Sequence, residues 1–280
     1  MQKPLLLIAL ALAVISCSNE KKTDETPISE TVVEVKTPEI KGEEITYEAD
    51  GVIMKGYIAY DASSTEKRPG VLVVHEWWGH NEHSRRSAMK LAELGYVALA
   101  VDMYGEGKQA EHPDDGMKFS GAVMQNFDGA KDRFNAAIAT LNANLMVDAE
   151  KTAAIGYCFG GGIVLNMARL GTDLDAVASF HGSLGAVQPA ESGAVQAKLL
   201  VMNGEADPFV GADAIEAFKA EMAAAGAKME FVNYPGAVHA FTNPAATEMG
   251  QKFELPLAYN EEADKASWAK MTEFLRSVFN

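Results

Sequence analysis

Cysteine is scarce in this chain of 280 residues, which contains only Cys17 and Cys158. Two cysteines cannot form the set of disulfides that stabilises many small exported domains. Long apolar runs are scarce as well, and the run at residues 5–15 is too short for a comfortable transmembrane helix. The sequence therefore excludes a disulfide-rich scaffold and does not predict a membrane-spanning helix at its N-terminus.

Basic residues are outnumbered by acidic ones. Lysine and arginine total 24 against 39 aspartates and glutamates, which gives a formal net charge of −15. The acidic residues are spread along the chain rather than gathered in blocks. Because binding to nucleic acid requires cations that neutralise phosphates, this composition argues against a nucleic-acid partner.

The N-terminus has the layout of an export signal. One early cation, Lys3, precedes the apolar run, which is followed by Ser16 and Cys17. The segment Val14-Ile15-Ser16-Cys17 resembles a bacterial lipobox, which predicts a lipoprotein signal peptide at residues 1–16 and lipidation of Cys17. An ordinary signal peptide with an incidental cysteine is the alternative. Several acyl chains, worth about 0.8 kcal/mol per buried CH₂, would give a lasting membrane anchor.

The predicted location is that of an exported bacterial lipoprotein, facing the periplasm or in the outer membrane. Ser18 follows the cysteine where inner-membrane retention is associated with aspartate. Residues 17–41 are charged and poor in aromatics, which predicts a flexible tether because they cannot bury enough apolar surface to fold. Residues 42–280 have the length of one α/β domain. Nothing in the sequence predicts an oligomeric state.

Within that domain, predicted strands alternate with predicted helices. The strands are expected at residues 44–49, 52–60, 71–74, 96–101, 152–155, 176–180, 198–201 and 230–234, and the helices at 81–94, 128–142, 163–170, 213–225 and 261–279. Residues 105–126 are expected to be irregular, a length typical of a functional cap. The pattern predicts a mostly parallel twisted sheet with helices on both faces and an antiparallel N-terminal edge, because Asp50-Gly51 signals a hairpin turn.

A glycine-rich turn provides the candidate nucleophile. Gly156-Tyr157-Cys158-Phe159-Gly160-Gly161 matches the strand–elbow–helix pattern of α/β-hydrolases, with cysteine in the nucleophile position. The N-terminus of the following helix points at the thiol and favours the thiolate. A buried structural cysteine is the alternative. A phosphate-binding loop is excluded because no Gly-Lys-Ser/Thr follows.

The candidate acid and base follow in the chain order of this fold. Asp207 comes after the strand at 198–201, and His239 comes after the last strand at 230–234. Asp207 could instead cap a helix or a turn, with Glu205 as the rival acid, and His239 could be a surface-loop histidine. The joint placement of the three residues favours a Cys158–His239–Asp207 triad.

The segment His75-Glu76-Trp77-Trp78-Gly79-His80 follows a predicted strand. The two histidines lie five residues apart, which does not put them on one helical face, so we predict no metal site. The backbone N–H groups of Trp77 and Phe159 are instead expected to form an oxyanion hole, where losing one donor costs about 2.7–4 kcal/mol. No cofactor is predicted.

Aromatic residues near these motifs suggest an apolar pocket. The candidates for its lining are Trp78, Tyr104, Tyr157 and His181. None of the remaining histidines is expected to transfer a proton; these are His75, His80, His83 and His181.

Five motifs together resemble the dienelactone hydrolase family over essentially all residues after the tether. They are His75-Glu76-Trp77-Trp78-Gly79, Asp102-Met103-Tyr104, Gly156-Tyr157-Cys158-Phe159-Gly160-Gly161, Gly204-Glu205-Ala206-Asp207-Pro208 and His239-Ala240-Phe241. The resemblance implies a metal-free Cys–His–Asp hydrolase that is acylated on Cys158 by a small ester or lactone. It also implies that Glu76 interacts with the thiol and helps to control its ionisation.

The chain departs from the family's dienelactone-specific members, which carry arginines that hold the substrate carboxylate. The corresponding neighbourhoods read Gly105-Glu106-Gly107 and Thr242-Asn243 here, so dienelactone itself is not the predicted substrate. Two alternatives to an esterase or lactonase remain. A non-catalytic ligand-binding lipoprotein would not need all three triad residues, and a thiol redox sensor would need a resolving cysteine that the chain does not offer once Cys17 is lipidated.

Overall fold

The computed structural model describes residues 37–49 and 51–280, and these residues contain one eight-stranded sheet. The order of strands across the sheet is β1-β2-β4-β3-β5-β6-β7-β8. The strands are β1 (Ile40–Ala49), β2 (Val52–Asp61), β3 (Arg68–Val74), β4 (Val97–Val101), β5 (Val147–Tyr157), β6 (Ala176–Phe180), β7 (Lys198–Gly204) and β8 (Met229–Tyr234).

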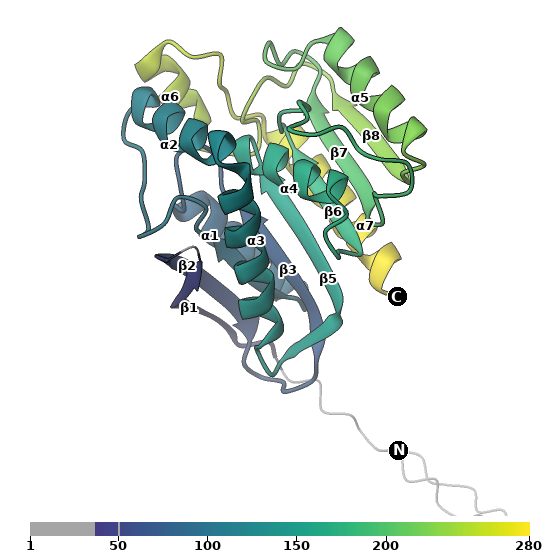
Figure 1. The fold of residues 1–280 in the computed structure, drawn as a ribbon. Helices are drawn as coiled ribbons and strands as arrows, with labels where there is room; N and C mark the ends of the chain where they lie inside the picture. Colours follow the sequence, from purple (N-terminus) through teal and green to yellow (C-terminus); the bar gives the residue numbers. More distant parts are fainter. Residues whose placement is uncertain (1–36, 50) are drawn as a thin grey trace, which may run out of the picture. The chain divides into compact units, whose positions relative to one another are not determined.

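The sheet is parallel except at one edge. β1 pairs antiparallel with β2, and β2 pairs antiparallel with β4, whereas every pairing from β4 through β3 to β8 is parallel (Figure 1). This confirms the predicted parallel sheet with an antiparallel N-terminal edge. Ile40 and Lys41, which the sequence assigned to the tether, are the first two residues of β1.

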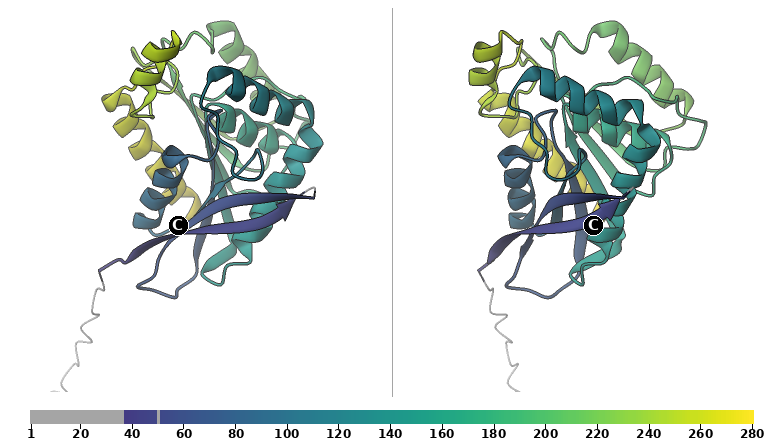
Figure 2. Two further views of the ribbon diagram at one scale, coloured as in Figure 1. Left: turned by 90° about the vertical axis from the view of Figure 1, so that its left-hand side faces the viewer. Right: turned by 60° about the vertical axis from the view of Figure 1, so that its left-hand side comes forward.

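Helices cover both faces of the sheet, as predicted. They are α1 (Glu82–Glu93), α2 (Pro113–Gln125), α3 (Phe127–Asn142), α4 (Phe159–Arg169), α5 (Ala212–Ala224), α6 (Ala246–Phe253) and α7 (Glu261–Phe279). Figure 2 shows α1 and α7 on one side of the sheet and α2 and α3 on the other. No helix within the described ranges is long and apolar enough to cross a membrane.

Each face of the sheet has its own apolar cluster, and alternate residues of a strand pack into one cluster or the other. Leu72 and Val74 of β3 pack into the cluster formed with α3, α4 and α5, whereas Val71 and Val73 pack into the cluster formed with α1 and α7. All four side chains are fully buried. This explains the unbroken apolar run of β3, because a strand covered on both faces has no solvent side.

The prediction of an irregular segment at residues 105–126 is wrong, because α2 occupies most of it. Pro113 stands in the first turn, His112 caps the helix by accepting from the Asp114 amide, and two aspartates follow in that turn. These start signals were present in the sequence, but Gly116 and Gly121 lower the helix propensity of the interior. The short helix α6 was also missed.

α4 begins at Phe159 rather than at residue 163, so the three consecutive glycines lie inside its first turns. Glycine is a poor helix former, and propensity alone therefore placed the start too late. The glycines are required by packing: a Cβ on Gly161 would lie 2.6 Å from Ser179 Oγ and 2.7 Å from Gly182 Cα. The signal peptide, the lipidation of Cys17 and most of the tether concern residues outside the described ranges and remain predictions.

Candidate active site

The candidate catalytic residues follow parallel strands at the same edge of the sheet. Trp77 follows β3, Cys158 follows β5, Asp207 follows β7 and His239 follows β8. Because the carboxyl ends of parallel strands meet along one edge, residues that are far apart in sequence become neighbours there. This edge is where open α/β sheets place their sites.

Cys158 stands at a sharply turned position between β5 and α4. Its backbone has φ 52° and ψ −115°, a conformation that non-glycine residues rarely adopt. Its amide donates to the Phe180 carbonyl at 3.0 Å, and the Gly160 amide donates to the His75 carbonyl at 3.1 Å. These bonds hold the turn against β6 and β3, so the strained residue is fixed by its surroundings. The thiol itself is partly exposed.

The glycines on either side of Cys158 are required by close backbone contacts. A Cβ on Gly156 would lie 2.2 Å from the Gly160 carbonyl oxygen, and a Cβ on Gly160 would lie 2.3 Å from that of Val74. Neither contact can be relieved by rotating a side chain. The pattern of glycines in the sequence therefore has a steric cause in the fold.

Gly160→Ala is expected to lower the free energy of unfolding by about 3 kcal/mol, at the upper end of the usual cost of overpacking, because the clash is with backbone. Gly121→Ala is the matched control, since a Cβ there meets nothing within 4 Å. Urea denaturation of both variants gives the comparison. Equal stability of the two variants would contradict the steric explanation.

His239 and Asp207 form a buried pair. Nδ1 of His239 lies 2.7 Å from Oδ2 of Asp207, and Oδ1 of Asp207 accepts from the Phe209 amide at 2.8 Å. Burial alone would lower the pKa of His239, but the charge on Cys158 and the hydrogen bonds to Asp207 and Cys158 outweigh it and raise that pKa to about 10. The imidazole thus links the carboxylate on one side to the thiol on the other. Glu205, the rival acid, is exposed.

A cavity of about 230 Å³ opens over the thiol and the imidazole. It is lined by Trp77, Ser120, Cys158, Phe159, Ser183, Phe209, Val210 and His239. No sequence motif indicated four of these lining residues: Ser120, Ser183, Phe209 and Val210. Phe209 follows Asp207 directly after Pro208 and packs edge-on against the His239 ring at 5.0 Å, so proximity to the acid was the signal that could have found it.

The two amides predicted to form the oxyanion hole belong to residues that line this cavity. Phe159 is the first residue of α4, where helix geometry offers its N–H no acceptor. Within the part of the chain that the structure describes, neither the Trp77 nor the Phe159 amide donates a hydrogen bond to protein. Both N–H groups are therefore without an acceptor among the described residues.

The four residues predicted to line the pocket lie outside the catalytic cavity. Trp78 packs against Phe253 of α6, and Tyr157 is buried beneath the turn, stacked on Phe180 at 4.7 Å. Tyr104 donates to the Trp77 carbonyl at 2.9 Å and so supports that segment. His181 is buried, and its Nε2 pairs with Thr242 Oγ1 at 2.8 Å.

Glu76 is buried close to the site and is bound by a residue that the sequence did not single out. Asn243 Nδ2 donates to Glu76 Oε2 at 2.6 Å, and His83 Nδ1 lies 3.5 Å from the same oxygen. Burial raises the pKa of Glu76 to about 7, although the Asn243 hydrogen bond and the charge of His239 act to lower it. The hydrogen bond that the structure records for this carboxyl goes to Asn243 rather than to the thiol.

The raised pKa of Glu76 has a consequence for stability. Its folded-state pKa lies above the ordinary value of 4.5, so the proton is bound more tightly in the folded protein. The resulting stability is complete below pH 4.5 and is lost as the pH rises through about 7. At about 1.4 kcal/mol per pKa unit, the loss amounts to roughly 3 kcal/mol.

Glu76→Gln is therefore expected to remove this pH dependence, because the amide imitates the protonated acid and can still accept from Asn243. The free energy of unfolding of wild type minus that of the variant should fall between pH 4.5 and pH 8. Urea titrations at a series of pH values measure this difference, in which the contributions of the other groups cancel. A flat difference curve would show that Glu76 ionises normally.

The environments of His75, His80 and His83 suit a structural role rather than proton transfer. His75 Nε2 accepts from the Met103 amide at 3.1 Å, and burial lowers its pKa. Burial also lowers the pKa values of His80 and His83 to about 3. Across residues 37–49 and 51–280, no group of three or more His, Cys, Asp or Glu side chains is placed to hold a metal ion.

The sheet is mostly parallel, and after β5 the chain turns sharply into a helix that begins at Phe159. This strand order and this turn define an α/β-hydrolase. Within that class the chain belongs to the dienelactone hydrolase family, whose model matches residues 54–279. The chain is thus a hydrolase of esters or lactones, and the resemblance given by its motifs is confirmed.

Solved structures and a curated relative agree with this assignment. A structure named m3DLH is 34% identical, has a TM-score of 0.81, and is matched over 86% of this chain and 99% of its own. A dienelactone hydrolase-like promiscuous phosphotriesterase from metagenomic libraries is 31% identical with a TM-score of 0.79, over the same shares of the two chains. Protein usf of Aquifex pyrophilus is 31% identical over 209 residues, which make up 72% of this chain and 87% of the relative.

Proposed function

We propose that this protein hydrolyses small esters or lactones through a covalent acyl-enzyme on Cys158. The observation that carries the proposal is one cavity that holds the Cys158 thiol and the His239 imidazole, with the 2.7 Å pair between His239 and Asp207 behind it. The nucleophile, the base and the orienting acid thus lie next to one another in the order that covalent catalysis requires.

The geometry supports a defined role for each group. Asp207 accepts from Nδ1–H of His239, which leaves Nε2 to take the proton of the thiol. The sulfur attacks the carbonyl carbon, and the oxyanion accepts from the Trp77 and Phe159 amides. The imidazolium then protonates the departing alkoxide. The same imidazole then deprotonates a water molecule, which attacks the thioester carbonyl. The C–S bond breaks, the acid is released, and the imidazolium returns the proton to the sulfur.

Glu76 is proposed to influence this cycle through its charge. It lies close enough to His239 for the imidazolium to act on its pKa, and that effect is reciprocal. An ionised Glu76 therefore favours the charged form of His239. Asn243 fixes the position of the carboxyl group through its 2.6 Å hydrogen bond.

The size of the cavity supports small acyl groups as substrates. Its volume of about 230 Å³ lies below the ~300–1,000 Å³ of typical drug-sized ligand sites. Trp77, Phe159, Phe209 and Val210 give it an apolar lining. Glu106, whose charge would oppose a substrate carboxylate, is 65% exposed and pairs with Lys108 instead of lining the cavity.

Hydrolysis of p-nitrophenyl esters from acetate to decanoate, together with simple lactones, tests the proposal. Short esters should turn over with a burst of p-nitrophenol, and alkylation of the protein by iodoacetamide should abolish both. A p-nitrophenyl phosphotriester belongs in the same assay because a similar structure is named for that activity. A folded protein with no turnover and no burst on any of these substrates would favour a non-catalytic binding protein.

We further propose that the enzyme is an exported lipoprotein held on a bacterial membrane by Cys17. The support is the segment Val14-Ile15-Ser16-Cys17 in the sequence, which lies outside the described residues. Cys17→Ser is expected to abolish incorporation of labelled palmitate and to move the protein from the membrane fraction to the soluble fraction. Its ester hydrolysis should be unchanged, because the groups proposed to carry the reaction, Cys158, His239 and Asp207, belong to the described domain. Retention of the label in the variant would refute the lipidation site.

A further inference from the structure

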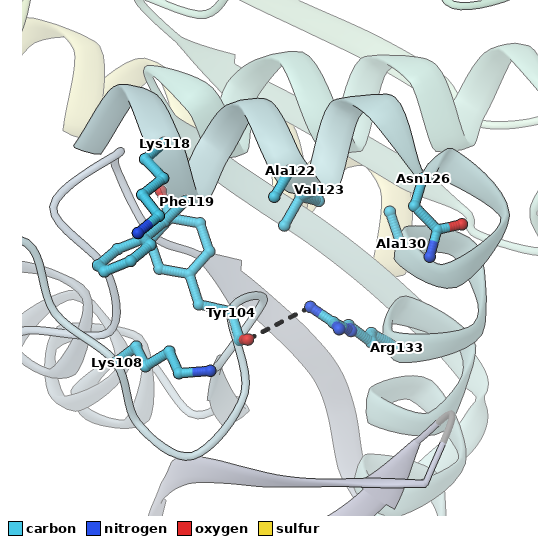
Figure 3. Close-up of a pocket in the computed structure, with 9 residues that line it drawn as sticks. All are labelled: Tyr104, Lys108, Lys118, Phe119, Ala122, Val123, Asn126, Ala130 and Arg133. Atoms are coloured by element: carbon cyan, nitrogen blue, oxygen red, sulfur yellow. Dashed lines mark hydrogen bonds between the residues drawn. The ribbon is translucent and has the colours of Figure 1, made fainter. Parts of the chain in front are cut away.

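A second cavity, larger than the catalytic one, lies between α2, α3 and the loop that follows β4 (Figure 3). Its volume is about 520 Å³, which falls within the ~300–1,000 Å³ of typical ligand sites. Cys158 and His239 line the smaller cavity and not this one. α2 separates the two, since Ser120 lines the catalytic cavity whereas Phe119 and Val123 line the other. The larger cavity is therefore a distinct compartment.

Positive charge gathers around this cavity although the protein carries a net charge of −15. Lys108 comes from the loop, Lys118 from α2 and Arg133 from α3, and no carboxylate lies among the described residues that line the cavity. Figure 3 shows Lys108 and Arg133 extending toward one another from the loop and from α3. A concave site lined by one sign of charge concentrates ligands of the opposite sign.

Arg133 forms no ion pair with a carboxylate of the described residues, although the buried Asp102 is close enough for both groups to act on the Tyr47 hydroxyl. Nη1 of Arg133 donates to the backbone carbonyls of Met103 at 2.8 Å and Tyr104 at 3.4 Å, which are neutral acceptors. Its Nε is buried and has no hydrogen-bond partner among the described residues. Lys118 likewise forms no ion pair within those residues, and Lys108 reaches only the exposed Glu106, at 4.0 Å. A bound anion would supply the missing counter-charge.

Apart from the amide of Asn126, the rest of the lining is apolar or aromatic. Phe119 and Tyr104 meet edge to face with their ring centroids 5.6 Å apart, and Ala122, Val123 and Ala130 complete the wall. In Figure 3, Ala122 and Val123 of α2 face the space that Lys108 and Arg133 enter. An inorganic ion gains nothing from such a wall, whereas an organic anion buries its apolar part against it.

We propose that this cavity binds a small organic anion, with its charged head at Lys108, Lys118 and Arg133 and its apolar body against Phe119 and Val123. Carboxylates and phosphate monoesters share the required chemistry. The proposal does not depend on the catalytic mechanism, because binding is measured directly.

Isothermal titration calorimetry on the full-length protein tests the proposal with three probes of similar shape: benzoate, phenyl phosphate and benzamide. Cys158 is first alkylated with iodoacetamide, so that the catalytic cavity is occupied. At least one anion should bind, and benzamide should bind at least about tenfold more weakly, because it lacks the charge. The two anions show which head group is preferred. Equal affinity for benzamide, or no heat from either anion at about 10 mM, overturns the proposal.

Substitution of the two exposed lysines of the lining tests whether the anion binds in this cavity. Lys108→Gln combined with Lys118→Gln should lower the affinity for the anion by at least about tenfold. Lys131→Gln is the matched control: it makes the same charge change at an exposed lysine of α3 that lies outside the cavity, and affinity should stay at the wild-type value. Thermal unfolding checks that each variant is folded, and Lys118→Gln alone replaces the pair if the pair is unstable. Unchanged affinity in the lysine variants overturns the proposal.

Discussion

Cys158→Ala should lower kcat/KM for short p-nitrophenyl esters by at least about a thousandfold, because the thiol is the group of the catalytic cavity that is hydrogen-bonded to the proposed base, His239. A small residual rate over water is expected, since the Trp77 and Phe159 amides still stabilise an oxyanion. Initial rates over a range of ester concentrations give the value. The burst of p-nitrophenol should disappear completely.

The control for this substitution is Cys17→Ser, which replaces the other cysteine of the chain and should leave kcat/KM unchanged. The backbone of residue 158 stays in the same strained conformation in the alanine variant, so its thermal midpoint should remain near that of wild type. A variant that folds normally and keeps its activity within tenfold would show that the thiol is not the nucleophile.

Asp207→Asn is expected to lower kcat by about 10⁴, the drop seen when the orienting acid of a triad becomes an amide. The carboxylate accepts both from His239 Nδ1 and from the Phe209 amide. An asparagine has one acceptor oxygen, so one of the two donors loses its partner and the imidazole is no longer held with Nε2 free to accept. Both the orientation and the charge of the imidazole are affected.

Glu205→Gln provides the matched control for the acid. It makes the same change from carboxylate to amide at an exposed position two residues away, and its kcat should stay within a few-fold of wild type. The pH profile separates a catalytic effect from a structural one. Loss of Asp207 removes one of the interactions that raise the pKa of His239, so the profile should shift in the Asn variant and not in the Gln variant. Equal losses in both variants would contradict the assignment of the acid.

The sequence predicted the parts of the site that are encoded locally or by chain order. The Gly156–Gly160 spacing follows from contacts of the turn with its own neighbours, and Asp207 and His239 follow strands whose apolar runs are plain to read. Contacts between distant segments could not be predicted in this way. Asn243 and Glu76 are 167 residues apart, and nothing in either motif indicates the other.

The predictions of pocket residues show a second limit. Tyr157 and Phe159 flank Cys158 symmetrically in sequence, yet Tyr157 is buried beneath the turn and Phe159 lines the cavity. Aromatic character indicates burial but not which side of the sheet a ring faces. The helix α2 was missed because its glycines lower the helix propensity of its interior. This helix supplies Ser120 to the catalytic cavity and Lys118 to the larger one.

Trapping of the acyl-enzyme tests whether Cys158 is the nucleophile. The full-length protein is mixed with p-nitrophenyl butyrate, quenched in acid within the burst, digested and analysed by mass spectrometry. We expect one butyryl group on the peptide that contains Cys158, and none on that peptide in Cys158→Ala. An acyl group on another residue, or rapid hydrolysis without any acylated peptide, would contradict it.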